Sequence, residues 1–250
     1  KIENAGQRIV DLKGVLVFRG ITTGFNKAFI INKEKKNELI LADLNNDQII
    51  KPLLQGRNIK KWTYNNNGEF ILQTGFDINI QDNFPHIYNH LNIFHDKLVR
   101  RDDQGRSWWN LRPCRYYHEF ERSEKIIWGL TADKWAFAYD DKQHYLPSNG
   151  YILTSVSLPI KYILAILNSK VLKYYFGFIG VMTAGGAFNL KHTTILLLPI
   201  PVANNLIIEI LSRKVTDILN LQTQNQDIST VENEVDKIVF KLYNLSYQEV

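Results

Sequence analysis

The spacing of apolar residues changes near residue 156, and this change limits the folds that the chain can adopt. Before it, apolar residues form short runs of strand length, at 15–18, 28–31, 70–72, 125–130, 135–139 and 151–154. From Ser157 onward they recur every three to four residues, which is the period of a helix. The sequence therefore predicts an α+β fold, in which a β-rich region with inserted helices precedes a helical C-terminal part.

Two helices are expected before residue 180. The apolar residues of 87–98 recur at helical spacing and predict an inserted helix that delivers Arg100 and Arg101 at its end. A broad apolar face over 160–175 predicts a second helix that stops near Gly177. Between them, the turn residues 140–143 predict a hairpin.

The run Pro199-Ile200-Pro201 can continue neither a helix nor a central strand. We therefore place a domain boundary there, with one domain over 1–201 and a C-terminal helical segment over 202–250. Helices are predicted over Asn205–Gln222 and, after an S-x-x-E capping box at 229–232, up to Asn244. We expect this helical pair to dock on a neighbouring domain or a partner helix.

Length and composition exclude several classes of protein. With 250 residues, 45% of them hydrophobic, the chain can bury a sizeable core. It has no run of about 20 apolar residues, so no membrane span is predicted. The single cysteine, Cys114, excludes an internal disulfide and fits the reducing cytoplasm. The start at Lys1 leads us to expect an internal or C-terminal segment of a longer polypeptide.

The charge balance is basic. The net charge is +5, and residues 1–65 hold 12 Lys and Arg against 6 Asp and Glu. A polyanionic partner such as DNA fits this balance, although many proteins that bind no nucleic acid share it.

A search for catalytic or metal-binding motifs finds only weak candidates. His86 and His90 are four residues apart on a predicted helix, but the glutamate of an H-E-x-x-H site is missing and His95 lies on the opposite face. Neither a dinucleotide-binding nor a phosphate-binding glycine motif occurs. We interpret Cys114 near His118 as a buried structural cysteine.

Two acidic clusters have the composition of a nuclease site. Glu121, Glu124 and Lys125 form one, and Asp140, Asp141 and Lys142 form the other. We interpret both as solvated turns at strand ends. The aromatic residues are expected to pack mostly in the core, because strands favour them for burial; they are Trp108, Trp109, Trp128, Trp135 and Tyr139.

Three stretches combine basic, amide and aromatic side chains. Cations in 51–62 suit phosphates, arginines in 100–109 suit guanine edges, and glycines in 182–192 permit a close backbone approach. Each stretch also fits an ordinary charged loop. The DNA-binding candidates are Arg57, Lys60, Lys61, Arg100, Arg101, Arg106, Asn189, Lys191 and His192.

Short landmarks follow one another in a characteristic order. They are Gly20–Phe29, Lys51–Trp62, Trp108–Arg112, Phe120–Ile127, Leu164–Ser169, and Gly185-Gly186 with Leu198–Pro201. In this order the chain resembles the TaqI-like C-terminal specificity domain, the target-recognition domain of adenine-specific DNA methyltransferases in restriction-modification systems.

That resemblance implies sequence-specific recognition of double-stranded DNA. It adds Thr23, Asn26 and Lys27 of the first landmark to the DNA-binding candidates. The N-P-P-Y or D-P-P-Y tetrapeptide and the cofactor-binding glycine motif of these methyltransferases are absent. We therefore expect no catalytic residue, metal or cofactor in this segment. S-adenosylmethionine is expected in a methyltransferase domain of the same polypeptide or complex, and Mg²⁺ only where an endonuclease is fused to it.

Two other functions stay open at this point. A metal-dependent nuclease fragment would cut DNA with Mg²⁺ through Glu121 or Asp141. A protein-interaction scaffold of a phage-defence complex would bind duplex DNA no better than its charge dictates.

Overall fold

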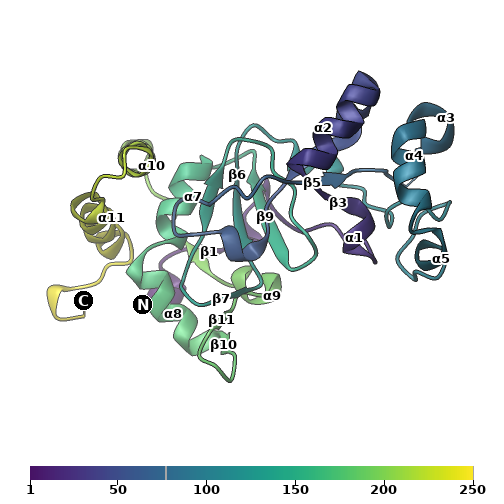
Figure 1. Cartoon of the computed structure of the whole chain (residues 1–250). Coiled ribbons are helices and arrows are strands. Elements are labelled where there is room, and N and C mark those ends of the chain that lie inside the picture. Colours follow the sequence, from purple (N-terminus) through teal and green to yellow (C-terminus); the bar gives the residue numbers. More distant parts are fainter. Residues whose placement is uncertain (77, 250) are drawn as a thin grey trace.

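A four-stranded antiparallel sheet lies at the centre of the computed structural model, which describes residues 1–76 and 78–249 (Figure 1). Strand β2 lies far from the other three in the sequence, and β9 pairs with both β2 and β6. In spatial order they are β2 (Val15–Arg19), β9 (Gly150–Ser155), β6 (Lys125–Gly129) and β8 (Ala138–Asp140).

Both faces of this sheet are buried, because its side chains alternate between two hydrophobic cores. Ile126 and Leu153 belong to one core, whereas their neighbours Ile127 and Ile152 belong to the other. Alternation with period two is what a pleated strand requires. An antiparallel sheet with two apolar faces needs a cover on each side, and the remaining elements provide both covers.

The first cover is a small sheet with a group of short helices. The sheet has the order β3 (Ile30–Asn32), β5 (Glu69–Leu72) and β4 (Ile50–Leu53). Three of the helices form the end of the molecule opposite the chain termini (Figure 1). The helices are α1 (Asn26–Phe29), α2 (Lys33–Ala42), α3 (Ile80–Asn83), α4 (Pro85–Asn92), α5 (His95–Leu98) and α6 (Tyr117–Phe120), with 3-10 turns η3 (Leu44–Ile49) and η4 (Gly56–Asn58).

The inserted helix predicted over 87–98 is not continuous. Helix α3 ends before Pro85, as the constraint on a residue preceding proline requires. Helix α4 ends at Asn92 and α5 begins at His95, yet Ile87, Leu91 and Leu98 are all buried in the same core. The apolar spacing was therefore informative about burial, although a bend replaces one turn of helix.

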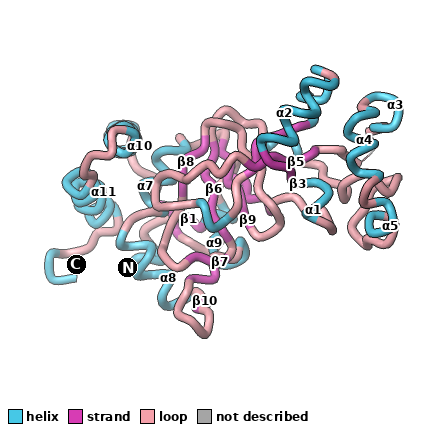
Figure 2. The backbone as a smooth tube through the Cα atoms, viewed as in Figure 1, coloured by secondary structure: helices cyan, strands magenta, loops and turns pink. Residues whose placement is uncertain are grey.

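The second cover consists of longer helices, which lie at the end that carries both termini (Figure 2). Helix α7 packs against β6 and β8, and α10 packs on α7. The buried residues of α10 fall at the predicted spacing. The four helices are α7 (Ile160–Leu167), α8 (Lys170–Ile179), α10 (Asn205–Thr223) and α11 (Ser229–Leu242).

The helix expected over 160–177 is broken between Leu167 and Lys170. The Asn168 side chain bonds both the backbone N–H and the C=O of Phe137, and Ser169 caps α8 by accepting from the Leu172 N–H. Two polar side chains thus end one helix and begin the next, which an apolar pattern does not reveal.

Small elements complete the fold. A hairpin of β10 (Val181–Met182) and β11 (Phe188–Asn189) pairs with β7 (Thr131–Ala132), and the predicted glycine loop forms its tip. Strand β12 (Pro199–Ile200) pairs with β1 (Gln7–Arg8), so the Pro-Ile-Pro run does hold a short strand. The others are α9 (His192–Ile195), η1 (Ile2–Asn4), η2 (Ile9–Asp11) and η5 (Tyr247–Glu249).

The α+β architecture with C-terminal helices is as predicted. Val215 of α10 and Val239 of α11 lie in the same core as Ile163 of α7. The boundary proposed after Pro201 stays a prediction. Within the described residues, no helix is both long and apolar enough to cross a bilayer.

The hairpin predicted at 140–143 is wrong. Strand β8 pairs backward with β6, and the residues after the turn form bridges to other segments, between Tyr145 and Leu53 and between Pro147 and Ile21. Asp140, which looked like a turn residue, is fully buried because it compensates a buried lysine.

Candidate nucleic-acid interface

A cavity of about 1190 Å³ opens beside β7, and its walls are strongly basic. Its lining contains six Lys and Arg residues and two acids, Asp133 and Glu232. We call it the cationic cavity. The cations come from η4 and the loop after it, from the β7–β8 connection and from the start of α8; they are Arg57, Lys60, Lys61, Lys134, Lys170 and Lys173.

The six cations differ in their partners. Across the described residues, Lys60, Lys134 and Lys173 have no carboxylate within 4 Å. The Arg57 side chain is 76% exposed, and its Nη2 pairs weakly with Glu69 Oε1, at a distance of 3.9 Å. Exposed cations without an acid partner are the groups that gain most from binding a polyanion.

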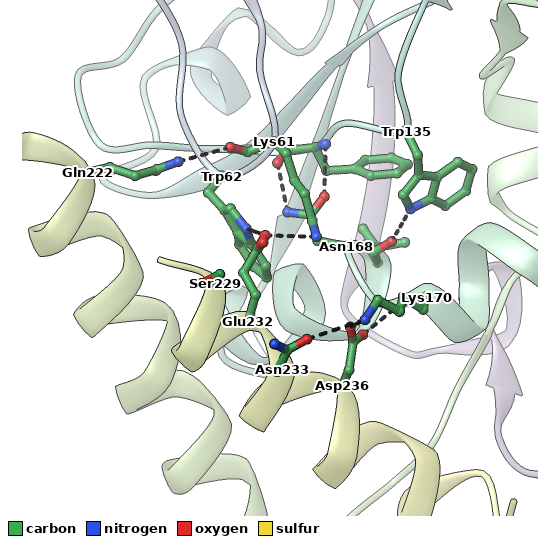
Figure 3. A network of polar contacts seen from close by, with 12 residues as sticks. Lys61, Trp62, Trp135, Asn168, Lys170, Gln222, Ser229, Glu232, Asn233 and Asp236 are labelled. Carbon is green, nitrogen blue, oxygen red and sulfur yellow. Dashed lines mark hydrogen bonds and ion pairs between the residues drawn. The ribbon is translucent and has the colours of Figure 1, made fainter. Parts of the chain in front are cut away.

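The two remaining cations are held by acids of α11. Lys61 Nζ lies 2.8 Å from the Glu232 carboxylate, and Lys170 Nζ lies 3.2 Å from Asp236. Figure 3 shows both pairs on one side of the helix. The predicted phosphate contact Lys61 is therefore in the cavity but is already paired.

The segment that carries Lys60 and Lys61 is fixed by the backbone hydrogen bonds of the next residue, Trp62. Trp62 is 1% exposed and has φ 75°, an unusual conformation for a bulky residue. Its N–H donates to Phe137 O and its C=O accepts from the Tyr139 N–H. The backbone under the two lysines is thus pinned to the segment that continues into β8.

In the loop at 100–106, one arginine is buried and two are exposed. Arg101 is 7% exposed, and its guanidinium donates to the C=O groups of Leu98, Thr23, Trp108 and Asn110. Burial lowers the pKa of Arg101 to about 10, which leaves it charged at neutral pH. Arg101 is therefore buried inside the protein. We predicted that Arg101 reads a base, but its guanidinium is not exposed for such a contact.

The other arginines of this loop are on the surface. Arg100 and Arg106 are exposed, and Arg106 lies over the Phe76 ring at 5.3 Å. Arg101 joins this loop to the Thr23 turn, so the first landmark and the loop lie together. Thr23 itself is 3% exposed and bonds Asn26, whereas Asn26 and Lys27 are exposed.

The third group of candidates follows the β10–β11 hairpin. Asn189 lies in β11 opposite Thr131, Lys191 is exposed, and His192 begins α9. Burial lowers the pKa of His192, and the charges of Lys191 and Arg19 add to this effect. His192 is therefore neutral at physiological pH and offers a hydrogen bond rather than a charge.

Two arginines outside the predicted set, Arg19 and Arg112, connect these groups. Arg19 Nε donates to Ser148 O at 2.7 Å, and the next residue, Asn149, lines the cationic cavity. Arg19 and Arg112 line a second cavity of about 250 Å³, and Arg112 lies 3.2 Å from Asp103 of the 100–106 loop. Arg19 ends β2 and Arg112 ends a landmark, but no spacing in the sequence relates them.

Each acidic cluster has one member that is buried and not in a solvated turn. Lys125 and Asp140 are both fully buried and paired, and Lys125 also donates to Phe120 O. Burial raises the pKa of Asp140, but the His144 hydrogen bond and the Lys125 charge outweigh it and bring the pKa to about 2. Glu121, which is exposed, pairs with Lys51 at 3.0 Å. The interpretation as solvated turns is therefore wrong for Lys125 and Asp140, which pair with each other across β6 and β8. It holds for Glu121, Asp141 and Lys142, which are exposed.

The remaining candidates for chemistry have structural surroundings. The His90 ring bonds Ala28 O, and burial lowers its pKa. Cys114 is half-buried, and burial raises the pKa of its thiol. Within residues 1–76 and 78–249, no three His, Cys, Asp or Glu side chains gather closely enough to hold a metal ion.

Comparison with protein families gives a match over residues 51–200, more than half of the chain, to the TaqI-like C-terminal specificity domain. The chain belongs to this family. The matched range contains Arg57, Lys60 and Lys61 as well as the 100–106 loop. The resemblance inferred from the ordered landmarks is confirmed, and this chain is a specificity domain.

Solved structures share the fold of this specificity domain. The type IIL restriction-modification enzyme MmeI, solved in complex with DNA, matches with a TM-score of 0.74 over 96% of this chain at 11% identity. The type IIG restriction endonuclease BpuSI matches with a TM-score of 0.53 over 97% of this chain at 13% identity. The domain spans only 34% and 31% of those two chains.

Proposed function

We propose that this specificity domain is part of a restriction-modification adenine methyltransferase and recognises a sequence in double-stranded DNA for that enzyme. The observation that carries the proposal is the cationic cavity, because three of its lysines have no acid partner among the described residues. Membership of the family and the fold shared with two restriction-modification enzymes support it.

In this proposal the cavity cations bind phosphates. Lys60, Lys134 and Lys173 would each neutralise one phosphate, with Arg57 at the rim and Lys191 beyond β11. Such contacts release counterions and supply affinity without reading sequence. They fix the position of the domain on the duplex.

Base reading is assigned to the exposed side chains of the 100–106 loop. Arg100 and Arg106 have exposed guanidinium groups, and a guanidinium can bond O6 and N7 of guanine together. Arg101 holds the loop in one shape through four carbonyl groups. A loop that is ordered before binding loses less entropy when it meets the base edges.

Methyl transfer is assigned to another domain of the parent enzyme. S-adenosylmethionine would bind there, and Mg²⁺ would be needed only if the parent also carries an endonuclease. This domain contributes binding and orientation, and none of its residues is assigned to the reaction.

The experiment is a salt titration of duplex binding by a triple variant, Lys60→Ala, Lys134→Ala and Lys173→Ala. The matched control replaces three exposed lysines outside the cavity, Lys13, Lys237 and Lys241, so that net charge falls equally. Each lost phosphate contact lowers the slope of log K against log salt by about 0.9.

We expect the cavity variant to lose between about 2 and 3 units of slope, and the control less than about 1. Equal losses would mean that binding follows net charge alone, as expected for a scaffold with a basic surface, and would contradict the assignment of the cavity.

A further inference from the structure

The C-terminal helices form one wall of the cationic cavity and bond the segment that carries its lysines. Glu232 of α11 accepts a hydrogen bond from Trp62 Nε1 and faces Lys61 Nζ at 2.8 Å (Figure 3). Gln222 of α10 donates to Lys61 O at 3.3 Å. Helices distant in the sequence thus set both the backbone and the side chain of Lys61.

Glu232 was expected to act as part of a capping box, but it has no such role here. The N–H of Ser229 bonds Asp227 instead, and α11 has no side-chain cap at Ile228. The Glu232 carboxylate is free to turn toward the cavity, where it is one of only two acids among the lining residues.

A second acid lies one turn further along α11. Asp236 is 4% exposed, accepts from the Lys170 backbone N–H at 2.9 Å and lies 3.2 Å from Lys170 Nζ. Because this carboxylate stabilises the start of α8, it is a structural contact. Glu232 differs from Asp236, since it pairs with the side chain of Lys61, which is still 35% exposed in this pair.

We propose that Glu232 is a positioning residue that keeps Lys61 from binding DNA phosphate. This inference rests on the proposed function of the cavity. A carboxylate at 2.8 Å competes with phosphate for the same ammonium group. Phosphate contacts strengthen binding to every sequence alike, so one contact fewer lowers non-specific affinity and leaves base reading to decide the site.

The test is Glu232→Gln, because glutamine keeps an oxygen that accepts from Trp62 Nε1 but removes the negative charge. Lys61 then becomes available to a phosphate. We expect the salt slope to steepen by about 0.9 and the affinity for an arbitrary duplex at 0.15 M salt to rise about fivefold. A merely structural role for Glu232 would lower the affinity instead.

The matched control is Glu234→Gln on the same helix. Glu234 pairs with Lys214 and does not line the cavity. Its substitution by glutamine changes the net charge by the same amount as Glu232→Gln. We expect its slope to equal that of the unchanged chain. Equal slopes for the two glutamine variants would overturn the proposal.

A third variant covers the case in which Glu232→Gln does not fold. Lys61→Met should leave the slope unchanged, since Lys61 makes no phosphate contact while Glu232 holds it. A slope reduced by about 0.9 would show that Lys61 already binds phosphate and would overturn the proposal.

In the double variant with Glu232→Gln, Lys61→Met should return the slope to its original value. If the unchanged chain shows no salt-dependent binding at all, the proposed function itself fails, and that result is distinguishable from equal slopes.

Discussion

Two lysines of this domain have opposite surroundings. Lys125 in β6 is fully buried, and its ammonium group is bonded to Asp140 and to Phe120 O. Lys60 beside the cationic cavity is exposed and has no carboxylate within 4 Å among the described residues. The first charge is used to hold the sheet together, and the second is left for a partner.

The same contrast separates two neighbouring arginines. The Arg101 guanidinium donates to four carbonyl groups inside the protein, whereas Arg106 is exposed. The type of residue therefore does not decide whether a cation stabilises the domain or is exposed for the DNA contact that we propose. Burial and partners decide it, so substitutions of the two kinds of cation, or of their partners, should have different consequences.

Asp140→Asn should produce the largest effect, because it leaves the Lys125 charge buried without an anion. We expect a loss of about 3–5 kcal/mol in the free energy of unfolding, measured by denaturant titration. Asp141→Asn, on the exposed neighbour, should change stability by less than about 0.5 kcal/mol. Similar effects at both positions would refute the division.

Arg101→Met should come next. It removes the guanidinium donor from the carbonyl groups of Thr23, Trp108 and Asn110, while Leu98 O keeps the Arg101 backbone N–H. We expect a loss of about 3 kcal/mol in the same titration. Sequence preference should weaken at several base pairs together, since the whole 100–106 loop loses its support. A fully stable variant that changes one base pair only would show that Arg101 reads a base.

Acid should remove the contribution of Asp140. Because its pKa in the folded protein is about 2, below the ordinary value of 3.8, the folded state binds fewer protons than the unfolded chain between these values. The stabilisation is complete above about pH 4 and falls by about 2 kcal/mol as the pH drops toward 2. In Asp140→Asn the stability should depend less on pH in this window; an unchanged pH dependence would contradict the pairing.

Arg106→Ala should lower the free energy of unfolding by no more than about 1 kcal/mol, the contribution of its contact with the Phe76 ring. We expect discrimination at one base pair to fall by about 1–3 kcal/mol, measured by competition between duplexes that differ at single positions. Loss of affinity for all duplexes alike would reassign Arg106 to phosphate.

Lys60→Ala should have the smallest effect, about fivefold in affinity at 0.15 M salt with a slope lower by about 0.9. The loss should be the same for every sequence. Lys142→Ala, an exposed lysine outside the cavity, serves as the control and should lose less than twofold. A loss confined to one sequence would contradict a phosphate role for Lys60.

The sequence predicted the fold well where local spacing determines burial. Val215 and Ile218 of α10 are buried at the spacing of the pattern, and Ile87 and Leu98 are buried although the helix bends between them. It failed where a side chain meets a partner distant in the sequence. Glu232 was read as a cap but bonds Trp62, 170 residues away.

The candidate site was predictable to the same degree. Local composition selected Arg57, Lys60 and Lys61, which line the cationic cavity, but not Lys134 and Lys173, which the fold brings to the same cavity. It also did not select Arg19 and Arg112, which line the second cavity. The role of the 100–106 loop stays a prediction. Local composition also gave Arg101 and Arg106 the same role, because burial is a property of the fold.

Target recognition by this domain can be tested by selection from a random duplex library with the purified 250-residue chain at two salt concentrations. If the domain recognises a DNA sequence, one asymmetric motif should be enriched at both concentrations, and more strongly at the higher one, where the phosphate contribution is weaker. A library that stays random at both concentrations, while binding remains salt-dependent, would contradict target recognition and leave only a basic surface.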